Sequence, residues 1–490
     1  MLKSAQLTQQ PVLRDGGPQR RADDPALGHL MAIFAIAVLG AATIAFAYWP
    51  GVMIDDARWQ YQQSVDNAYE DWHPPLMAWI WHQLMRLQPG PGPMLILQLA
   101  LYWVGLALVA MWLYRQGKPR LGIAAACVGW IPAPFALMGS VTKDGLMTGT
   151  LCSAVGLLLW SGTAHNEKLR TTLRVATLVL LLSAAGLRAN AFLACVPLAL
   201  AALPKRLTCT VPRFALAAVA SGAIFLVAPG AVAAALHAED TDSQLSLIIF
   251  DLGGITEHSG VNQFPDLHVA NPLAINRRCY DPFEWDSYST WAHRPCPLGF
   301  AAFQSLVDEG DVDPRMVWIK AILAHPVAYA QHRLTHFNLS TWFVVRDNPL
   351  SPGWTRSVDN PWHFQVQPNR VLTAADNVAN GAARTPLGWP IFWIALALAV
   401  LLACFSAKLS YTVTAIAGSA FLYGMGYLIF GVATGMRYYV WTITGAALAA
   451  VLAAGELSKR SEPFGRGAAL LAGSAVLVPT VLAAAARIYL

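Results

Sequence analysis

Eleven apolar stretches constrain this chain more than any other feature, because each is close to the roughly 20 residues that cross a bilayer as a helix. Only 12% of the residues are charged, about half the roughly 25% of soluble domains, and 56% are hydrophobic. A soluble, disordered or fibrous protein is therefore excluded, and we predict an α-helical polytopic membrane protein with about 11 transmembrane helices. The stretches run near 30–49, 93–114, 121–140, 145–162, 174–189, 191–204, 213–236, 388–405, 411–432, 438–455 and 467–486.

Basic residues fix the expected orientation. If the N-terminus starts in the cytoplasm, 17 of the 33 Lys and Arg residues fall in the cytoplasmic tail and loops, against 6 in the short outer loops. Because cytoplasmic loops carry the excess of Lys and Arg, this split predicts an inside N-terminus and an outside C-terminus. The net charge is +5, but in a membrane protein the distribution of charge is more informative than its sum, and no nucleic-acid partner is expected.

The same assignment divides the chain into segments. We expect a cytoplasmic tail over 1–27, an N-terminal membrane module over 28–236 that includes a first outer loop over 50–93, an outer-face (periplasmic) domain over 237–387, and a C-terminal membrane module over 388–490. The tail and the first helix suit an uncleaved signal anchor. The segment 237–387 has the size of a domain, and its pattern predicts a mixed helical and irregular fold. Of the 28 acidic residues, 22 fall outside, so the chemistry is expected at the outer face.

Two of the seven cysteines, Cys279 and Cys296, lie in the outer segment 237–387, with 16 residues between them. The outer compartment permits disulfides, so we predict a bridge between these two. Two unpaired thiols are the alternative. Metal binding is disfavoured because the chain contains no CxxC spacing.

The first outer loop carries five carboxylates within 17 residues, beginning with the adjacent pair Asp55 and Asp56. Two neighbouring carboxylates repel each other unless a cation or a substrate hydroxyl compensates, so the pair is a candidate acid/base or metal site. A solvated loop or a helix N-cap is the alternative, since Asp is favoured at both. His73 follows in the same loop, and its alternative role is that of a turn residue before Pro74 and Pro75.

Three cations, Lys143, Arg188 and Arg437, are expected at the outer ends of three different helices. Arg presents a planar fork that matches phosphate oxygens, whereas Lys acts as a point charge, so the three are candidates for binding a phosphate. The alternative is a side chain that reaches the headgroups, or a partner for a carboxylate such as Asp144. Tyr438, next to Arg437, is either a substrate contact or one of the aromatic residues common at membrane interfaces.

These segments, in these places, resemble the GT-C membrane glycosyltransferases. That superfamily includes the protein O-mannosyltransferases, the aminoarabinose and arabinofuranose transferases and the oligosaccharyltransferases. The resemblance implies a sugar donor linked to polyprenyl phosphate, and a first-loop acidic residue that holds the acceptor or a divalent cation. Several relatives have Asp-Glu or a spaced acidic pair instead of Asp-Asp, which leaves metal use open. The resemblance rests on Asp55–Asp56, His73–Leu76, Lys143–Asp144, Arg188–Asn190 and Gly435–Tyr439.

The roles that follow are expectations. An attacking hydroxyl needs a base, and Asp55 or Asp56 can supply it. We expect Asp55 nearest the membrane and the acceptor, because it directly follows an apolar run, and Asp56 paired with Arg58 or sharing a divalent cation with Asp55. No cofactor is assigned beyond that cation. The phosphate-binding candidates are Arg437, Lys143 and Arg188, and the substrate-contact candidates are His73, Asp144 and Tyr438.

The predicted function is a glycosyltransferase that moves a sugar from a polyprenyl-phosphate donor to an envelope glycan, lipid or protein, with inversion, at the outer face of the inner (plasma) membrane. A transporter or flippase of a lipid-linked glycan is one alternative, and a glycan polymerase or ligase is another. Transporters usually place ionisable groups near the bilayer midplane and often contain inverted repeats, whereas the charge here collects at one surface. The sequence has no Gly-rich phosphate loop, HExxH or GxSxG motif, which argues against a nucleotide-driven pump, a metalloprotease or a lipase.

Overall fold

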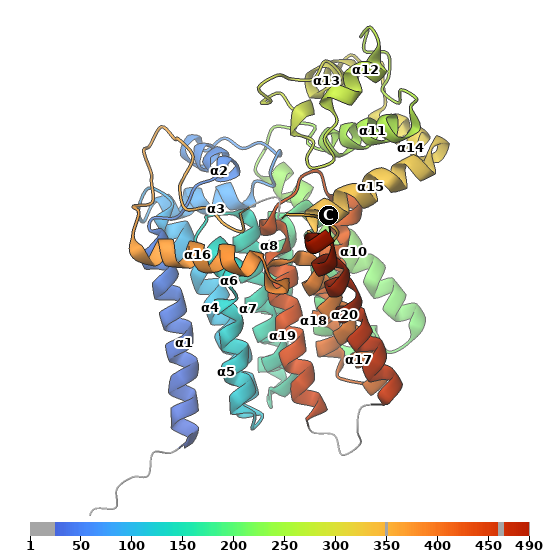
Figure 1. Ribbon diagram of the computed structural model, residues 1–490. Helices are drawn as coiled ribbons and strands as arrows, with labels where there is room; N and C mark the ends of the chain where they lie inside the picture. The colour runs from blue at the N-terminus through green and yellow to red at the C-terminus, as the bar shows by residue number, and fades with distance from the viewer. Residues whose placement is uncertain (1–24, 348–350, 459–464, 490) are drawn as a thin grey trace, which may run out of the picture.

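A computed structural model describes residues 25–347, 351–458 and 465–489. Within these ranges the protein is almost entirely helical, and β-structure is limited to isolated bridges (Figure 1). The expected tail over 1–27 lies almost wholly outside the described residues. Nine described helices are long and apolar enough to cross a membrane, so the protein is a multi-pass membrane protein. They are α1 (Pro25–Tyr48), α4 (Gly92–Arg115), α7 (Lys143–Thr163), α8 (Glu167–Leu187), α10 (Val211–Ala235), α17 (Pro390–Ala407), α18 (Tyr411–Phe430), α19 (Val440–Leu457) and α20 (Arg466–Tyr489).

The other two expected spans are helical but shorter. The stretch 121–140 forms α5 (Pro119–Cys127), a 3₁₀ turn η1 (Val128–Trp130) and α6 (Pro132–Leu137). Ile131 has the extended ψ of 125° that a residue before proline prefers, and this breaks the helix. The stretch 191–204 begins with the 3₁₀ turn η2 (Ala189–Ala191) and continues as α9 (Phe192–Ala202). The 3₁₀ turn η3 (Lys205–Leu207) then leads to α10.

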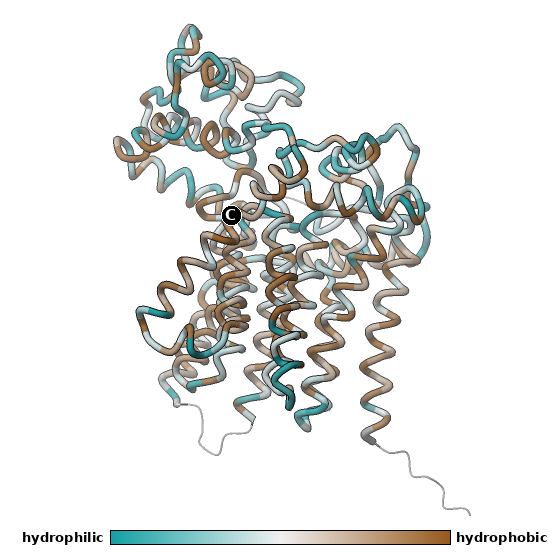
Figure 2. The backbone as a smooth tube through the Cα atoms, turned by 180° about the vertical axis from the view of Figure 1, so that it is seen from behind, coloured by the Kyte–Doolittle hydropathy of each residue, from teal (hydrophilic) through white to brown (hydrophobic). Residues whose placement is uncertain are grey.

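The helices form a bundle with a cap at one end (Figure 1). The start of α1 lies at the end away from the cap, and the C-terminus lies next to it. Two helices of the first loop, α2 (Asp55–Asp66) and α3 (Leu76–Met85), lie at the cap end. Figure 2 shows hydrophobic residues along the bundle and many hydrophilic ones in the cap and the first loop.

The cap is residues 245–340, and it has a hydrophobic core of its own around Phe250, Tyr288 and Phe303. Cys279 and Cys296 are joined in a disulfide within it. Its elements are α11 (Leu245–Ser259), α12 (Pro272–Cys279), η4 (Asp286–Tyr288), α13 (Phe300–Asp308), α14 (Pro314–Ala324) and α15 (Pro326–Ser340).

A buried ion pair joins two helices of the cap. Asp251 of α11 accepts a hydrogen bond from the indole N–H of Trp318 at 2.7 Å, and its other oxygen lies 2.6 Å from Nη2 of Arg333 in α15. Asp251 and Arg333 are both buried. Because a buried charge is costly without a partner, this pair ties α11 to α15.

The rest of the expected domain 237–387 packs on the bundle. Trp342, Val345 and Val366 belong to the core of the bundle and not to that of the cap. The helix α16 (Arg370–Ala383) crosses the top of the bundle against α6 and α1, and the 3₁₀ turn η5 (Pro386–Gly388) leads from it to α17 (Figure 1). The segment therefore contains two parts with different packing partners.

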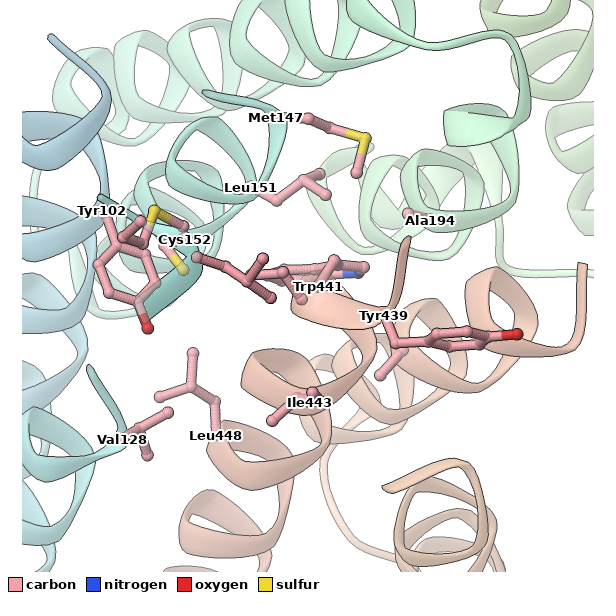
Figure 3. Packing of buried hydrophobic residues seen from close by; sticks show 14 of the residues in the cluster. Tyr102, Val128, Met147, Leu151, Cys152, Ala194, Tyr439, Trp441, Ile443 and Leu448 are labelled. Carbon is pink, nitrogen blue, oxygen red and sulfur yellow. The ribbon is translucent and has the colours of Figure 1, made fainter. Parts of the chain in front are cut away.

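Packing and hydrogen bonds in the core of the bundle fix the position of α19 relative to its neighbours. Trp441 lies at the centre of the packing in Figure 3, with Leu151 on one side and Ile443 on the other. Its indole N–H donates to Ser419 of α18 at 3.0 Å, and the Ser419 hydroxyl donates to the carbonyl of Ala194 in α9 at 2.7 Å. These bonds satisfy buried polar groups and fix the start of α19, which follows the 3₁₀ turn η6 (Met436–Tyr439).

Candidate active site

The first loop is held against the segment that leads into α7. The amide of Val52 donates to the carbonyl of Gly139 at 3.0 Å, and the amide of Val141 donates back to the carbonyl of Val52 at 2.9 Å. The side chain of Thr142 then caps α7 by accepting from the amide of Gly145 at 3.1 Å. This pairing places the start of α2 beside the start of α7, so Asp56 and Lys143 become neighbours.

Asp56 is the centre of the site. Its Oδ2 accepts from Nζ of Lys143 at 2.9 Å and from Nη1 of Arg437 at 3.0 Å, and its Oδ1 lies 3.4 Å from Nη2 of Arg437. The carboxylate therefore bridges a cation at the start of α7 and a cation in η6, just before α19. The side chain of Lys143 is 8% exposed and that of Asp56 is 21% exposed, so the contacts are shielded from water but open on one side.

His73 completes the group around Asp56. Its Nδ1 lies 2.8 Å from Nζ of Lys143, and its Nε2 lies 3.5 Å from Oδ2 of Asp56. Burial, followed by the charge of Lys143, lowers the pKa of His73 to about 3, so the imidazole is neutral at neutral pH. A neutral ring that accepts at Nδ1 from the ammonium carries its proton on Nε2, which then points toward Asp56. His73 thus orients Lys143 and Asp56 without adding charge.

Arg188 lies in the same region, after the end of α8. Its Nη1 forms a short ion pair with the buried carboxylate of Asp144, and its Nε donates to Oδ1 of Asn190 at 2.9 Å. Its guanidinium lies 4.7 Å from the ring centroid of Tyr438, and the guanidinium of Arg437 lies 5.0 Å from the same ring. Tyr438 is therefore in contact with both arginines, at a distance where a cation is attracted to an aromatic ring.

The structure thus brings together seven of the eight residues that the sequence nominated for the site. Lys143, Arg188 and Arg437 supply three positive charges, whereas Asp56 and Asp144 supply two negative ones, which leaves one net positive charge. Burial raises the pKa of Asp56, but the charges of Arg437 and Lys143 outweigh it and hold that pKa well below its ordinary value of 3.8. The carboxylate is ionised, and the group as a whole attracts an anion.

Asp55 is the exception. Its side chain is 70% exposed and lies 3.6 Å from Nη2 of Arg58, away from the cations. The expectation that Asp55 faces the site while Asp56 pairs with Arg58 was wrong: the two carboxylates have exchanged places. Both begin α2, where successive residues point about 100° apart around the axis. The phase of the helix, and not distance from the apolar run, decides which one faces inward.

The side chains around Asp56 are not a suitable set of ligands for a divalent cation. Asp55 and Asp56 do not converge, and the oxygens of Asp56 already face Lys143 and Arg437. Among the described residues, no group of three or more His, Cys, Asp or Glu side chains is arranged to hold a metal ion. A divalent ion favours several oxygen ligands and negative charge, and this site carries positive charge.

Two aromatic residues beside the cations were not singled out by any motif. Tyr427, near the end of α18, stacks on Tyr438 with ring centroids 5.4 Å apart. Trp354 lies 5.9 Å from the guanidinium of Arg437. Tyr427 follows Tyr423 at a helical spacing of four near the end of an apolar span, which is a usable signal, whereas the irregular segment around Trp354 offers none.

Comparisons with known proteins show similarity at the level of structure. No family model and no curated protein matches the sequence. The oligosaccharyltransferase of Archaeoglobus fulgidus, tethered with an acceptor peptide, matches 94% of this chain at 12% identity and a TM-score of 0.35. AglB of the same organism, with an inhibitory peptide and a dolichol-phosphate, matches 95% at 13% identity and a TM-score of 0.38. ArnT of Cupriavidus metallidurans, bound to undecaprenyl phosphate, matches 88% at 15% identity and a TM-score of 0.34.

These neighbours are membrane glycosyltransferases of the GT-C superfamily, the one that the sequence motifs resemble. The chain spans 55% of the length of the Archaeoglobus oligosaccharyltransferase and 78% of that of ArnT. A likeness at these TM-scores carries no conclusion about a reaction. The functional argument therefore starts from the residues around Asp56.

Proposed function

We propose that this protein is a glycosyltransferase that moves a sugar from a polyprenyl-phosphate donor to a hydroxyl of an envelope glycan, lipid or protein, at the outer, periplasmic face of the inner membrane. The observation that supports it is the cluster of Lys143, Arg188 and Arg437 at the cap ends of membrane helices. A donor anchored by a lipid tail keeps its phosphate at this interface, where fixed cations can bind it.

The charge of the site suits a sugar phosphodiester. Such a donor has one negative charge, which matches the one net positive charge of the cluster. When the bond between the anomeric carbon and the phosphate oxygen breaks, the leaving polyprenyl phosphate gains negative charge. Preorganised donors such as the Arg437 guanidinium and the Lys143 ammonium stabilise that developing charge in a site shielded from water.

Asp56 is the proposed base. A donor phosphate that takes the N–H groups of Arg437 and Lys143 competes with Asp56 for them. When the phosphate binds Arg437 and Lys143, these cations lower the pKa of Asp56 less strongly. The Asp56 carboxylate then becomes a better base. It can then take the proton of the acceptor hydroxyl while the hydroxyl oxygen bonds to the anomeric carbon and the phosphate leaves. A single displacement of this kind inverts the anomeric centre.

The proposal is tested by following one sugar and one lipid. Mass spectrometry of envelope glycans with and without the gene product should show that one sugar residue disappears. The purified protein in lipid nanodiscs should bind undecaprenyl phosphate, and a matched lipid alcohol without the phosphate should bind far more weakly. An unchanged set of glycans together with equal binding of the two lipids would contradict the proposal. Loss of a whole glycan, with its lipid-linked form accumulating, would favour a flippase, polymerase or ligase.

A further inference from the structure

A short segment of the cap, residues 284–286, contacts the loop that leads to Arg437. The amide of Trp285 donates to the carbonyl of Val432 at 2.9 Å, and Glu284 forms an antiparallel bridge with Ala433. The segment 432–433 precedes Arg437 by only a few residues, between the end of α18 and η6. Residues 284–286 of the cap are therefore fixed next to the loop that carries a cation of the site.

The first loop holds the same segment from the other side. Trp72 stacks on Trp285 with ring centroids 5.8 Å apart and an angle of 29° between the planes. Trp72 directly precedes His73, which contacts Lys143. Because Trp285 is buried and held by both Val432 and Trp72, the next residue, Asp286, has a defined place beside the segments that carry His73 and Arg437.

Asp286 lies within reach of the charges of this site. It is half-buried in η4, and it accepts a hydrogen bond from the side chain of Trp291. Asp56 and Arg437 lie close enough for their charges to act on its carboxyl group. Burial raises the pKa of Asp286, and the negative charge of Asp56 acts in the same direction. Unlike Asp56, it forms no ion pair with the cation cluster, so its oxygens can accept hydrogen bonds from a ligand.

Trp291 places an exposed aromatic ring next to Asp286. Its ring lies nearly perpendicular to those of Trp72 and Trp285, at 5.2 and 5.3 Å, yet the residue is 55% exposed. The ring is therefore fixed by its neighbours and still open to a ligand. An exposed ring beside a carboxylate suits a sugar, because the apolar face of the sugar can stack while its hydroxyls donate to the carboxylate.

We propose that Trp291 and Asp286 form a subsite for the acceptor, which is a neutral sugar ring. This rests on the proposed function. Trp291 stacks on the ring, and Asp286 accepts from a hydroxyl next to the reacting one, so that the reacting hydroxyl faces Asp56. Asp281 and Glu284 add acidic groups to the same stretch of the cap, and they disfavour an acceptor that carries its own acid. Asp286 is thus a positioning residue for the acceptor and not the base.

The test separates acceptor binding from donor binding. Saturation-transfer NMR on the full chain in nanodiscs uses a panel of neutral methyl glycosides as probes, with methyl glucuronide as the acidic counterpart. The wild type should saturate at least one neutral glycoside and leave the glucuronide nearly unsaturated. Trp291→Ala and Asp286→Asn should each lower that signal about fivefold or more. Trp59→Ala is the matched control, because Trp59 is 53% exposed on α2 at the same end of the bundle, and it should leave the signal unchanged.

Undecaprenyl phosphate binding is the second measurement, and it should be the same in the wild type, Trp291→Ala and Asp286→Asn. The subsite is refuted if no neutral glycoside is saturated, if the glucuronide is saturated equally, if both variants keep the signal, or if Trp59→Ala loses it as well. Weaker lipid binding in Asp286→Asn would show that Asp286 acts on phosphate binding, and this result would also refute the subsite. A wild type that binds sugar but not the lipid phosphate would instead contradict the proposed donor.

Discussion

Arg437 and Asp56 are 381 positions apart in the chain, and a guanidinium nitrogen of one lies 3.0 Å from a carboxylate oxygen of the other. The first loop and the segment that leads into α19 therefore meet in one place. Neither residue is fully exposed, so the contact is partly shielded from water and its energy is not that of a surface pair.

Arg437→Ala should weaken the binding of undecaprenyl phosphate by about 10- to 100-fold, in line with the roughly 1.5–3 kcal/mol of a hydrogen bond to a charged group. Arg437→Lys keeps the charge but loses the fork, so its affinity should lie between the two. Binding is measured in nanodiscs with a labelled lipid. Arg58→Ala is the control, since Arg58 pairs with exposed Asp55 instead. If Arg437→Ala kept full affinity for undecaprenyl phosphate, Arg437 would not be a ligand of the phosphate.

Asp56→Asn should insert normally, still bind undecaprenyl phosphate and lose turnover by on the order of 10²- to 10⁴-fold, the usual contribution of a general base. Asp55→Asn is the matched control one position away, and it should stay within about threefold of the wild type, because Asp55 is exposed and faces Arg58. Turnover is measured as release of polyprenyl phosphate from the glycosylated donor. The reverse ranking of the two variants would restore Asp55 as the base.

Acidification should destabilise the protein through its neutral histidines. Burial lowers the pKa of both His73 and His336 to about 3, from the ordinary value of 6.5. Between these values the unfolded chain binds protons that the native chain does not, so stability is full above pH 6.5 and falls as the pH drops toward 3, by at most about 1.4 kcal/mol per unit for each group.

Thermal unfolding in nanodiscs at pH 7.5 and 5.0 measures this effect. The midpoint should be lower at pH 5.0, and the difference should shrink in His73→Gln and in His336→Gln. His268→Gln is the control, because the side chain of His268 is 87% exposed and should leave the difference unchanged. A midpoint that rises on acidification would show that other groups dominate.

Asp251→Ala should loosen the cap. The substitution leaves Arg333 buried without its carboxylate, which typically costs about 3–5 kcal/mol. Hydrogen exchange of the amides in α11 and α15 should therefore become faster, while the exchange of α19 stays as in the wild type. Asp266→Ala removes a carboxylate that is 84% exposed in the same cap and should change neither. Unchanged exchange in α11 and α15 would mean that the pair contributes little to the fold.

The cap end should face outward. Gly162 lies at the end of α7, on the side of the bundle away from the cap, so reporter fusions after Gly162 should report the cytoplasm. Fusions after Gly260 of the cap should report the outer side. The reason is the 17-to-6 split of basic residues between the two sides. An inside signal from the fusion at Gly260 would place the cation cluster in the wrong compartment for the proposed donor.

Much of the fold was predictable because its signals are local. An apolar run of about 20 residues predicts a span wherever it stands, and Lys143, Arg188 and Arg437 were found from their places at helix ends. The break of the third span follows from the prolines Pro132 and Pro134, which a prediction from the length of the apolar run alone does not take into account.

The rest of the site depends on contacts between distant segments. Asp56 rather than Asp55 faces inward because α2 packs beside a lysine 87 positions away, and a dipeptide contains no information about that phase. Asp286 reaches the site only because its segment bridges to residues 432 and 433. No motif marks a position whose neighbours come from two other parts of the chain.

The contact between Asp56 and Arg437 also sets an order of events during biosynthesis. A ribosome makes Asp56, His73 and Lys143 before Arg437, and until Arg437 is made the carboxylate has only the lysine as a charged partner within the site. Arg437 is made 381 positions after Asp56. A nascent or truncated protein that ends before η6 therefore lacks one cation of the cluster, and the site is assembled only after the segment that carries Arg437 has been made.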